Sequence, residues 1–167
     1  EKFLRSDCFA RNREVEDRPR PVAGRSARRP ETGRADLLPA WRFLVLRDRA
    51  ALASLAEILP YGKMLNDAAL GIVVCGDLAK AHRQALSYLL QDCSAAVENL
   101  LLAAHFLGLG AVWLGVHPRE DRIAHLRSLF QLPEHVLPIA AIAAGYPAET
   151  HPPRTRFAAT RVHRERW

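Results

Sequence analysis

The sequence has few cysteines, and their arrangement argues against two common kinds of site. Its 167 residues contain three, at Cys8, Cys75 and Cys93. The number is odd, the spacing is wide and no Cys-x-x-Cys pair is present, which argues against a disulfide framework and against a zinc site. Thiols used in this way fit a reducing compartment, and we therefore expect the protein to be cytoplasmic.

Long apolar segments are also scarce. The chain starts without the apolar stretch that is typical of a secretory signal. Residues 99–118 are free of Asp, Glu, Lys and Arg, and their length comes close to that of a membrane span. They include Asn99, His105 and three glycines, however, which predict a helix followed by a strand. We expect this segment to be buried within a soluble protein, with no membrane partner.

Familiar catalytic signatures are missing. The sequence contains no nucleophile elbow, no Walker A loop and no Gly-x-Gly-x-x-Gly segment. Its seven histidines form no set that predicts a metal site. We therefore predict no catalytic residue of the chain's own and no bound metal.

The positive charge is local. The net charge is +6, and residues 1–34 contain ten Lys and Arg against six Asp and Glu. A basic segment of this kind can mark a nucleic-acid-binding module, but these arginines lack interleaved aromatics, and no helix-turn-helix, RRM or zinc-finger pattern follows them. We rank that alternative last and expect no nucleic-acid partner.

Length and composition predict one domain. A chain of 167 residues with 49% hydrophobic content can bury a single substantial core. Residues 10–40 are rich in Arg, Pro and Glu and have almost no periodic apolar pattern. We therefore separate an atypical, irregular N-terminal segment, residues 1–40, from a regular domain over residues 41–167.

Within that domain, apolar patterns predict alternating strands and helices. Strands are expected over residues 41–46, 70–76, 111–115 and 136–145, the last interrupted at Pro138. Helices are expected over residues 48–59, 64–67, 84–107 and 119–130. From Cys93 onward the third helix is apolar nearly all round, so it must be enclosed by protein. The proline- and arginine-rich residues 146–167 cannot build a core and are expected to lie across another surface.

This order of elements, with the motifs inside it, resembles the FMN-dependent nitroreductases. The resemblance covers residues 41–167 and is carried by seven short segments, at residues 41–43, 60–64, 91–96, 99–104, 108–115, 145–147 and 154–157. They read Trp-Arg-Phe, Pro-Tyr-Gly-Lys-Met, Gln-Asp-Cys-Ser-Ala-Ala, Asn-Leu-Leu-Leu-Ala-Ala, Gly-Leu-Gly-Ala-Val-Trp-Leu-Gly, Gly-Tyr-Pro and Arg-Thr-Arg-Phe. The resemblance implies an α+β fold: a central, mostly antiparallel or mixed sheet flanked by helices, with a long buried central helix and an extended C-terminal tail.

The resemblance also implies which residues hold FMN. Trp113, Leu114 and Gly115 lie where similar proteins bring main chain to the edge of the flavin ring. The alternative is that Gly108 and Gly110 only cap the end of a helix and that Trp113 is a core aromatic. Arg154 and Arg156 stand two apart in an extended segment, so both can hold one phosphate. The alternative for this pair is a solvated basic tail.

The N-terminus departs from the family pattern. Similar proteins present an Arg-Arg-Ser-x-Arg signature that grips the FMN phosphate, whereas this sequence offers Arg5 and Ser6, followed by Asp-Cys-Phe. Arg28 and Arg29 lie too close to Trp41 to replace them, because the usual intervening helix would not fit. A weakened phosphate clamp is one consequence that this departure predicts.

The function implied by the resemblance is electron transfer from NAD(P)H through FMN to a small electron acceptor such as a nitroaromatic or a quinone. Similar enzymes are homodimers with the site between the subunits. A homodimer also follows from the sequence, because the apolar helix after Cys93 and the C-terminal tail need more cover than one chain supplies. The alternative is a degenerate protein of the same fold that has weak or no FMN binding and no catalysis.

Overall fold

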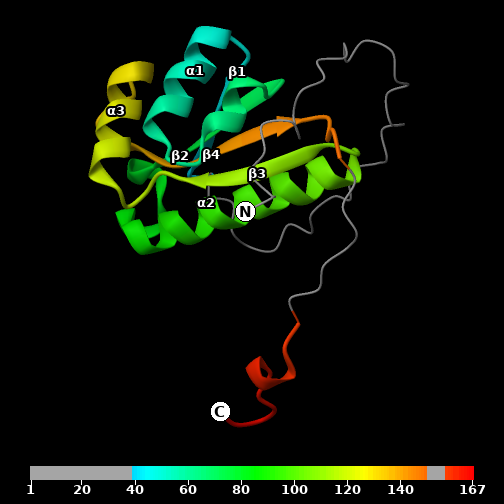
Figure 1. The fold of residues 1–167 in the computed structure, drawn as a ribbon. Coiled ribbons are helices and arrows are strands. Elements are labelled where there is room, and N and C mark those ends of the chain that lie inside the picture. Colours follow the sequence, from blue (N-terminus) through cyan, green and yellow to red (C-terminus); the bar gives the residue numbers. More distant parts are fainter. Residues whose placement is uncertain (1–38, 150–156) are drawn as a thin grey trace, which may run out of the picture.

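An antiparallel sheet between two layers of helices forms the body of the molecule. The computed structural model describes residues 39–149 and 157–167 (Figure 1). The four strands stand in the order β1-β2-β4-β3, and each neighbouring pair is antiparallel. They are β1 (Trp41–Leu46), β2 (Leu70–Asp77), β3 (Gly110–Gly115) and β4 (Val136–Gly145). The predicted α+β class with a mostly antiparallel sheet is confirmed.

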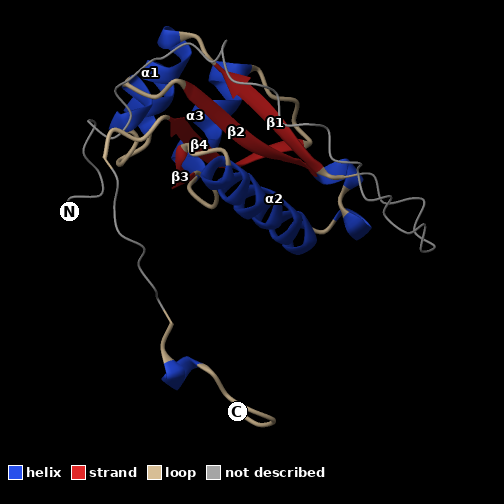
Figure 2. Ribbon diagram, turned by 90° about the vertical axis from the view of Figure 1, so that its right-hand side faces the viewer, coloured by secondary structure: helices blue, strands red, loops and turns tan. Residues whose placement is uncertain are grey.

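Three α-helices flank this sheet. They are α1 (Arg49–Ile58), α2 (Leu86–Phe106) and α3 (Glu120–Phe130). Figures 1 and 2 show α1 and α3 on one side of the sheet and α2 on the other. Short 3-10 helices complete the described chain: η4 (Lys63–Asn66), η5 (Leu78–Lys80), η6 (His82–Gln84) and η7 (Ala159–Arg161). No helix in residues 39–149 or 157–167 has the length and apolar character needed to cross a membrane.

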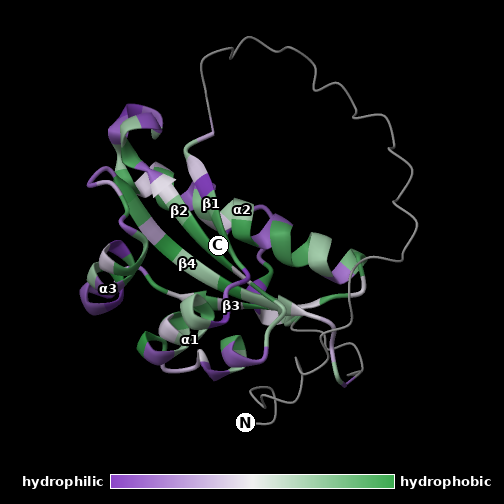
Figure 3. Ribbon diagram, turned by 90° about the horizontal axis from the view of Figure 1, so that it is seen from above, coloured by the Kyte–Doolittle hydropathy of each residue, from purple (hydrophilic) through white to green (hydrophobic). Residues whose placement is uncertain are grey.

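The strand β2 is buried on both faces, as its unbroken apolar run predicts. Val73 and Cys75 belong to the core beneath α1 and α3, whereas Ile72 and Val74 belong to the core beneath α2. Successive side chains of a strand point to opposite faces, so a central strand between two helical layers needs apolar residues at every position. Figure 3 shows β2 and β4 as largely hydrophobic.

Pro138 does not interrupt β4, and that expectation was wrong. The strand is continuous, and the register passes from Val74 opposite Ala140 to Cys75 opposite Pro138, which leaves Ile139 as a bulge. On its other side, β4 pairs with β3 only as far as Ala140. Pro138 therefore has a neighbouring strand on one side only, where its missing N–H costs least.

The long helix α2 is buried on one face only. Leu89, Cys93 and Val97 pack against the sheet and are fully buried. On the outer face, Leu102 is 52% exposed and Phe106 is 90% exposed. The prediction that protein encloses this helix all round is thus met for its inner face alone. The C-terminal residues 157–167 extend away from the sheet and its helices (Figure 1), and Val162 and Trp167 are exposed.

Two buried thiols lie in different cores: Cys75 in the core beneath α1 and α3, and Cys93 in the core beneath α2. The Cys93 thiol donates to the carbonyl oxygen of Cys75 over 3.7 Å. Burial, with a smaller contribution from Cys93, raises the pKa of Cys75 from 9.0 to about 12. Burial, with a smaller contribution from Asp92, raises the pKa of Cys93 from 9.0 to about 11. Both groups are therefore neutral thiols near neutral pH, and such thiols are poor nucleophiles.

These raised pKa values predict a loss of stability in alkali. Because the folded chain holds the thiol protons more tightly than the unfolded chain, their contribution is complete below about pH 9 and declines as the pH rises toward the folded values. Denaturant unfolding should therefore show a steeper fall in stability from about pH 8 to about pH 10.5 in the natural chain than in a Cys75→Ala/Cys93→Ala variant. If stability falls equally steeply with pH in the two proteins, the raised pKa values of Cys75 and Cys93 are contradicted.

Candidate functional site

The strand β3 lies at the edge of the sheet, and its outer side is open among the described residues. Its other side pairs with β4, where the N–H groups of Val116 and His117 donate to the oxygen of Ile139 at 3.3 and 3.1 Å. In an antiparallel strand, the N–H and C=O of one residue point the same way, and the direction alternates along the strand. Since Val116 points toward β4, the main-chain groups of Gly115 and Trp113 point to the open edge.

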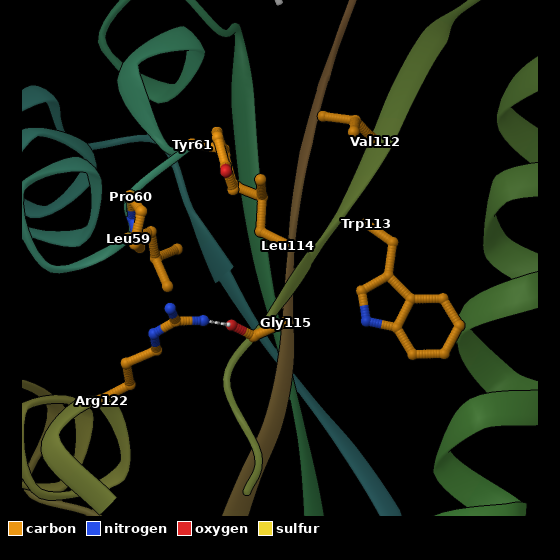
Figure 4. Close-up of a pocket in the computed structure, with 8 residues that line it drawn as sticks. All are labelled: Leu59, Pro60, Tyr61, Val112, Trp113, Leu114, Gly115 and Arg122. Atoms are coloured by element: carbon orange, nitrogen blue, oxygen red, sulfur yellow. Dashed lines mark hydrogen bonds between the residues drawn. The ribbon is translucent and has the colours of Figure 1, made fainter. Parts of the chain in front are cut away.

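A cavity of about 220 Å³ follows this open edge (Figure 4). Its floor is the main chain of β3, and its wall is the segment that follows α1; the guanidinium of Arg122, from α3, closes one end. The lining residues are Leu59, Pro60, Tyr61, Val112, Trp113, Leu114, Gly115 and Arg122. The cavity is therefore an apolar slot with a hydrogen-bonding edge and a single cationic side chain.

The wall of the slot is fixed by the way in which α1 ends. Asp48 caps the start of this helix by accepting from the N–H of Ala51 at 2.8 Å. Pro60 cannot continue the helix, because it has no N–H to donate. The N–H of Gly62 instead donates to the oxygen of Leu59 at 2.8 Å, and a Cβ at position 62 would come within 2.8 Å of the Leu59 side chain. This tight turn leaves Leu59, Pro60 and Tyr61 beside β3.

Arg122 reaches the slot because α3 begins directly after β3. The N–H of Arg119 donates to the oxygen of Val116 at 3.0 Å, so the chain turns back within a few residues. The first turn of α3 then places Arg122 next to the end of the strand, where its Nη1 donates to the oxygen of Gly115 at 2.6 Å. The ion pairs of the described residues do not include Arg122.

Gly115 is open at its side-chain position and at the edge of the sheet. A Cβ at this position would meet no atom within 4 Å. Trp113, which lies on the same face of the strand, is 39% exposed, and Figure 4 shows its indole pointing toward α2 and away from the slot. Leu114 has the opposite orientation and points toward Tyr61. Trp113 therefore lines the slot through its main chain, and the missing side chain of Gly115, which would lie on the same face as Trp113, leaves the end of the strand open from that side.

Three of the residues that the sequence suggests for FMN lie together here, namely Trp113, Leu114 and Gly115. The other four, Arg5, Ser6, Arg154 and Arg156, lie outside the described residues. Sequence reasoning missed Arg122, because an arginine beside Glu120 and Asp121 at a helix start looks like an ordinary solvated charge. The one available signal was its short distance along the chain from Gly115.

The slot has main-chain groups and apolar side chains that could bind a ligand, but few side chains that could act as acid, base or nucleophile. Among its described lining residues, only Tyr61, Trp113 and Arg122 carry a polar group on the side chain, and the indole of Trp113 points away from the slot (Figure 4). No group of three or more His, Cys, Asp or Glu within residues 39–149 and 157–167 could hold a metal ion. The arrangement suits a flat ligand that presents hydrogen-bonding atoms at its edge and brings its own chemistry.

Comparison with known proteins shows to which family this chain is similar. The model of the nitroreductase family matches residues 29–146. A protein of Methanothermobacter thermautotrophicus, provisionally named NADH dehydrogenase/NAD(P)H nitroreductase, is 48% identical over 127 residues, which are 76% of this chain and 65% of the relative. The match thus spans just under two thirds of that relative's length.

Solved structures agree. A protein of Parabacteroides distasonis with the same provisional name superposes with a TM-score of 0.71 at 41% identity, over 77% of this chain and 74% of that one. A provisional nitroreductase from Desulfovibrio desulfuricans, solved in complex with FMN, gives a TM-score of 0.62 at 35% identity, over 77% and 73% of the two chains. The chain whose edge strand ends at Gly115 therefore belongs to the nitroreductase family.

Proposed function

We propose that the protein is an FMN-dependent oxidoreductase that passes electrons from NAD(P)H to electron-poor acceptors such as nitroaromatics and quinones. The observation that carries the proposal is the open edge of β3 at Gly115. On that side no described strand pairs with the main chain, and a Cβ would meet no atom within 4 Å. The FMN in the Desulfovibrio relative and the NAD(P)H in the name of the Methanothermobacter relative support it.

The residues of the slot fit a flavin ring. Isoalloxazine is flat and carries carbonyls and ring nitrogens at its edge, so it needs main-chain partners and no intervening Cβ. Gly115 provides both, with Trp113 and Leu114 preceding it on the same strand. The apolar side chains of Leu59 and Leu114 keep water from the enclosed side.

The chain's own part in the reaction is binding and orientation. Bound FMN supplies the hydride chemistry, so the protein needs no nucleophile or general base. We assign the FMN phosphate to Arg154 and Arg156, with Arg5 and Ser6 as N-terminal partners. Guanidinium suits this role because it can donate two parallel hydrogen bonds to phosphate oxygens. The division into an N-terminal segment, residues 1–40, and a flavin-binding domain remains part of the proposal.

A cytoplasmic homodimer is the form that we propose for the working protein. The outer apolar patch of α2, defined here as Leu102, Phe106 and Leu107, is exposed in the single chain. A contiguous apolar patch on a soluble protein commonly marks an interface. A second copy of this chain would cover it, and the family's site lies between subunits.

The first test is the cofactor itself. We expect the purified protein, supplied with FMN, to show an oxidised-flavin absorbance band that bleaches when NAD(P)H is added without oxygen. A Gly115→Val variant should fold normally, because a Cβ at this position meets no atom within 4 Å. It should bind FMN at least about tenfold more weakly, or roughly 1.4 kcal/mol, because a branched side chain on the Trp113 face would narrow the approach of the ring to the strand edge. Ser128→Val, on the exposed side of α3, is the control and should leave binding unchanged.

An unchanged flavin affinity in Gly115→Val would remove this edge from the site. A natural chain that binds no FMN at all would favour the degenerate protein, in keeping with the Asp-Cys-Phe that follows Ser6.

The phosphate assignment is tested by comparing FMN with riboflavin, which lacks the phosphate. An Arg154→Gln/Arg156→Gln variant should lose FMN affinity by a factor of ten or more, since each hydrogen bond to an ionised group contributes about 1.5 to 3 kcal/mol. Its affinity for riboflavin, measured by quenching of flavin fluorescence, should stay the same. Arg164→Gln/Arg166→Gln, in the same tail, serves as the control, and equal losses in both variants would point to a general charge effect.

The dimer is tested by placing charge on the α2 patch. A Leu102→Glu/Phe106→Glu variant should remain folded, because both side chains are exposed, and should sediment as a monomer with reduced FMN affinity. Ser128→Glu adds charge to an exposed position on α3 and should leave the dimer intact. A natural chain that is a stable monomer, or a charged variant that still dimerises, would overturn the proposed interface.

A further inference from the structure

The end of β3 holds an interaction that the proposed function leaves unexplained. Arg122 lines the slot and donates through Nη1 to the oxygen of Gly115 at 2.6 Å. Figure 4 shows its guanidinium below Leu59, at the end of the slot where β3 stops. We propose that Arg122 is a positioning residue that makes this end of the slot a donor-rich, cationic edge for the flavin ring. This inference rests on the proposed function.

A ligand at this end of the slot meets the main chain of Gly115. The N–H and C=O of Gly115 both point to the open edge of the sheet, so an approaching ring would face one donor and one acceptor. The acceptor atoms of a flavin edge, its carbonyl oxygens and unprotonated ring nitrogens, are repelled by a main-chain oxygen. Arg122 donates to that oxygen and so weakens the repulsion, and the N–H of Gly115 and the guanidinium are the donors at this position.

Arg122 also brings charge to the slot. Among the described residues that line it, no other is charged. The nearby pair of Arg119 and Asp121, at 3.4 Å, leaves the Asp121 carboxylate on the other arginine. A flavin ring that has gained two electrons and one proton is an anion, and a cation within reach holds the anion more strongly than the neutral oxidised ring. Arg122 should therefore favour the reduced cofactor.

α3 offers a matched control for this role. Arg127 lies on the same helix and donates through Nη2 to the oxygen of Glu134 at 2.7 Å. Both arginines thus hold a main-chain carbonyl, and each has a buried Nε with no hydrogen-bond partner among the described residues. Only Arg122 lines the slot. Loss of a purely structural clamp should affect both variants in the same way.

The experiment measures the affinity of the full chain for oxidised and for reduced FMN, the latter under anaerobic conditions, in Arg122→Leu, Arg122→Lys and Arg127→Leu. Arg122→Leu should weaken binding of reduced FMN by about tenfold more than binding of oxidised FMN, which lowers the midpoint potential of the bound flavin. Arg122→Lys keeps a charge and a donor and should restore most of the preference for reduced FMN. Arg127→Leu should leave the ratio of the two affinities unchanged.

The outcomes separate this inference from the proposed function. A natural chain without FMN binding overturns the proposed function. If the natural chain binds FMN and Arg122→Leu weakens both redox forms equally, Arg122 is a structural residue and the inference alone fails. Should Arg122→Leu not fold, the Arg122→Lys variant decides. If its affinity for reduced FMN, relative to oxidised FMN, equals that of the natural chain, the cationic role is supported. If that relative affinity falls by about tenfold, the cationic role is contradicted.

Discussion

The open edge of β3 is the constraint on which the rest of the site depends. A strand at the edge of a sheet presents main-chain donors and acceptors that need partners, and exposed edges of this kind attract other chains. Here the edge is short, and other parts of the chain limit its exposure. The end of α1 lies beside it across an apolar slot, and Arg122 donates to the oxygen of Gly115. What remains is a small set of main-chain groups next to a position without a side chain.

The elements themselves could be predicted from the sequence because each faces a simple requirement. β2 lies between two cores and needs apolar residues at every position, so its run is unbroken from Leu70 to Cys75 apart from Gly71. α1 has a capping aspartate and a proline after its end. Pro138 misled the prediction because its tolerance depends on where β3 stops pairing, which is a tertiary fact that no local pattern contains.

The site was predictable only in part. Trp113, Leu114 and Gly115, which the structure brings together at the slot, could be picked out as candidates because a strand that ends in glycine after a glycine turn is a local signal and matches the family; their contact with FMN stays a prediction. Arg122 could not, since its partner is a main-chain oxygen and its neighbours suggest solvation. The phosphate residues Arg154 and Arg156, with Arg5 and Ser6, lie outside the described residues and stay predictions.

One strand serves two surfaces, and this links cofactor binding to assembly. Leu114 points into the slot beside Tyr61, whereas Trp113 points the other way, toward α2 (Figure 4). The side of the molecule on which α2 lies also carries the exposed patch of Leu102, Phe106 and Leu107. Since Trp113 and Gly115 lie two residues apart on one strand, a partner that contacts Trp113 would also restrict the main chain of Gly115. In the proposed dimer, a second subunit would both cover apolar surface and hold the main chain of Gly115 in place, which would link assembly to the binding of the proposed flavin.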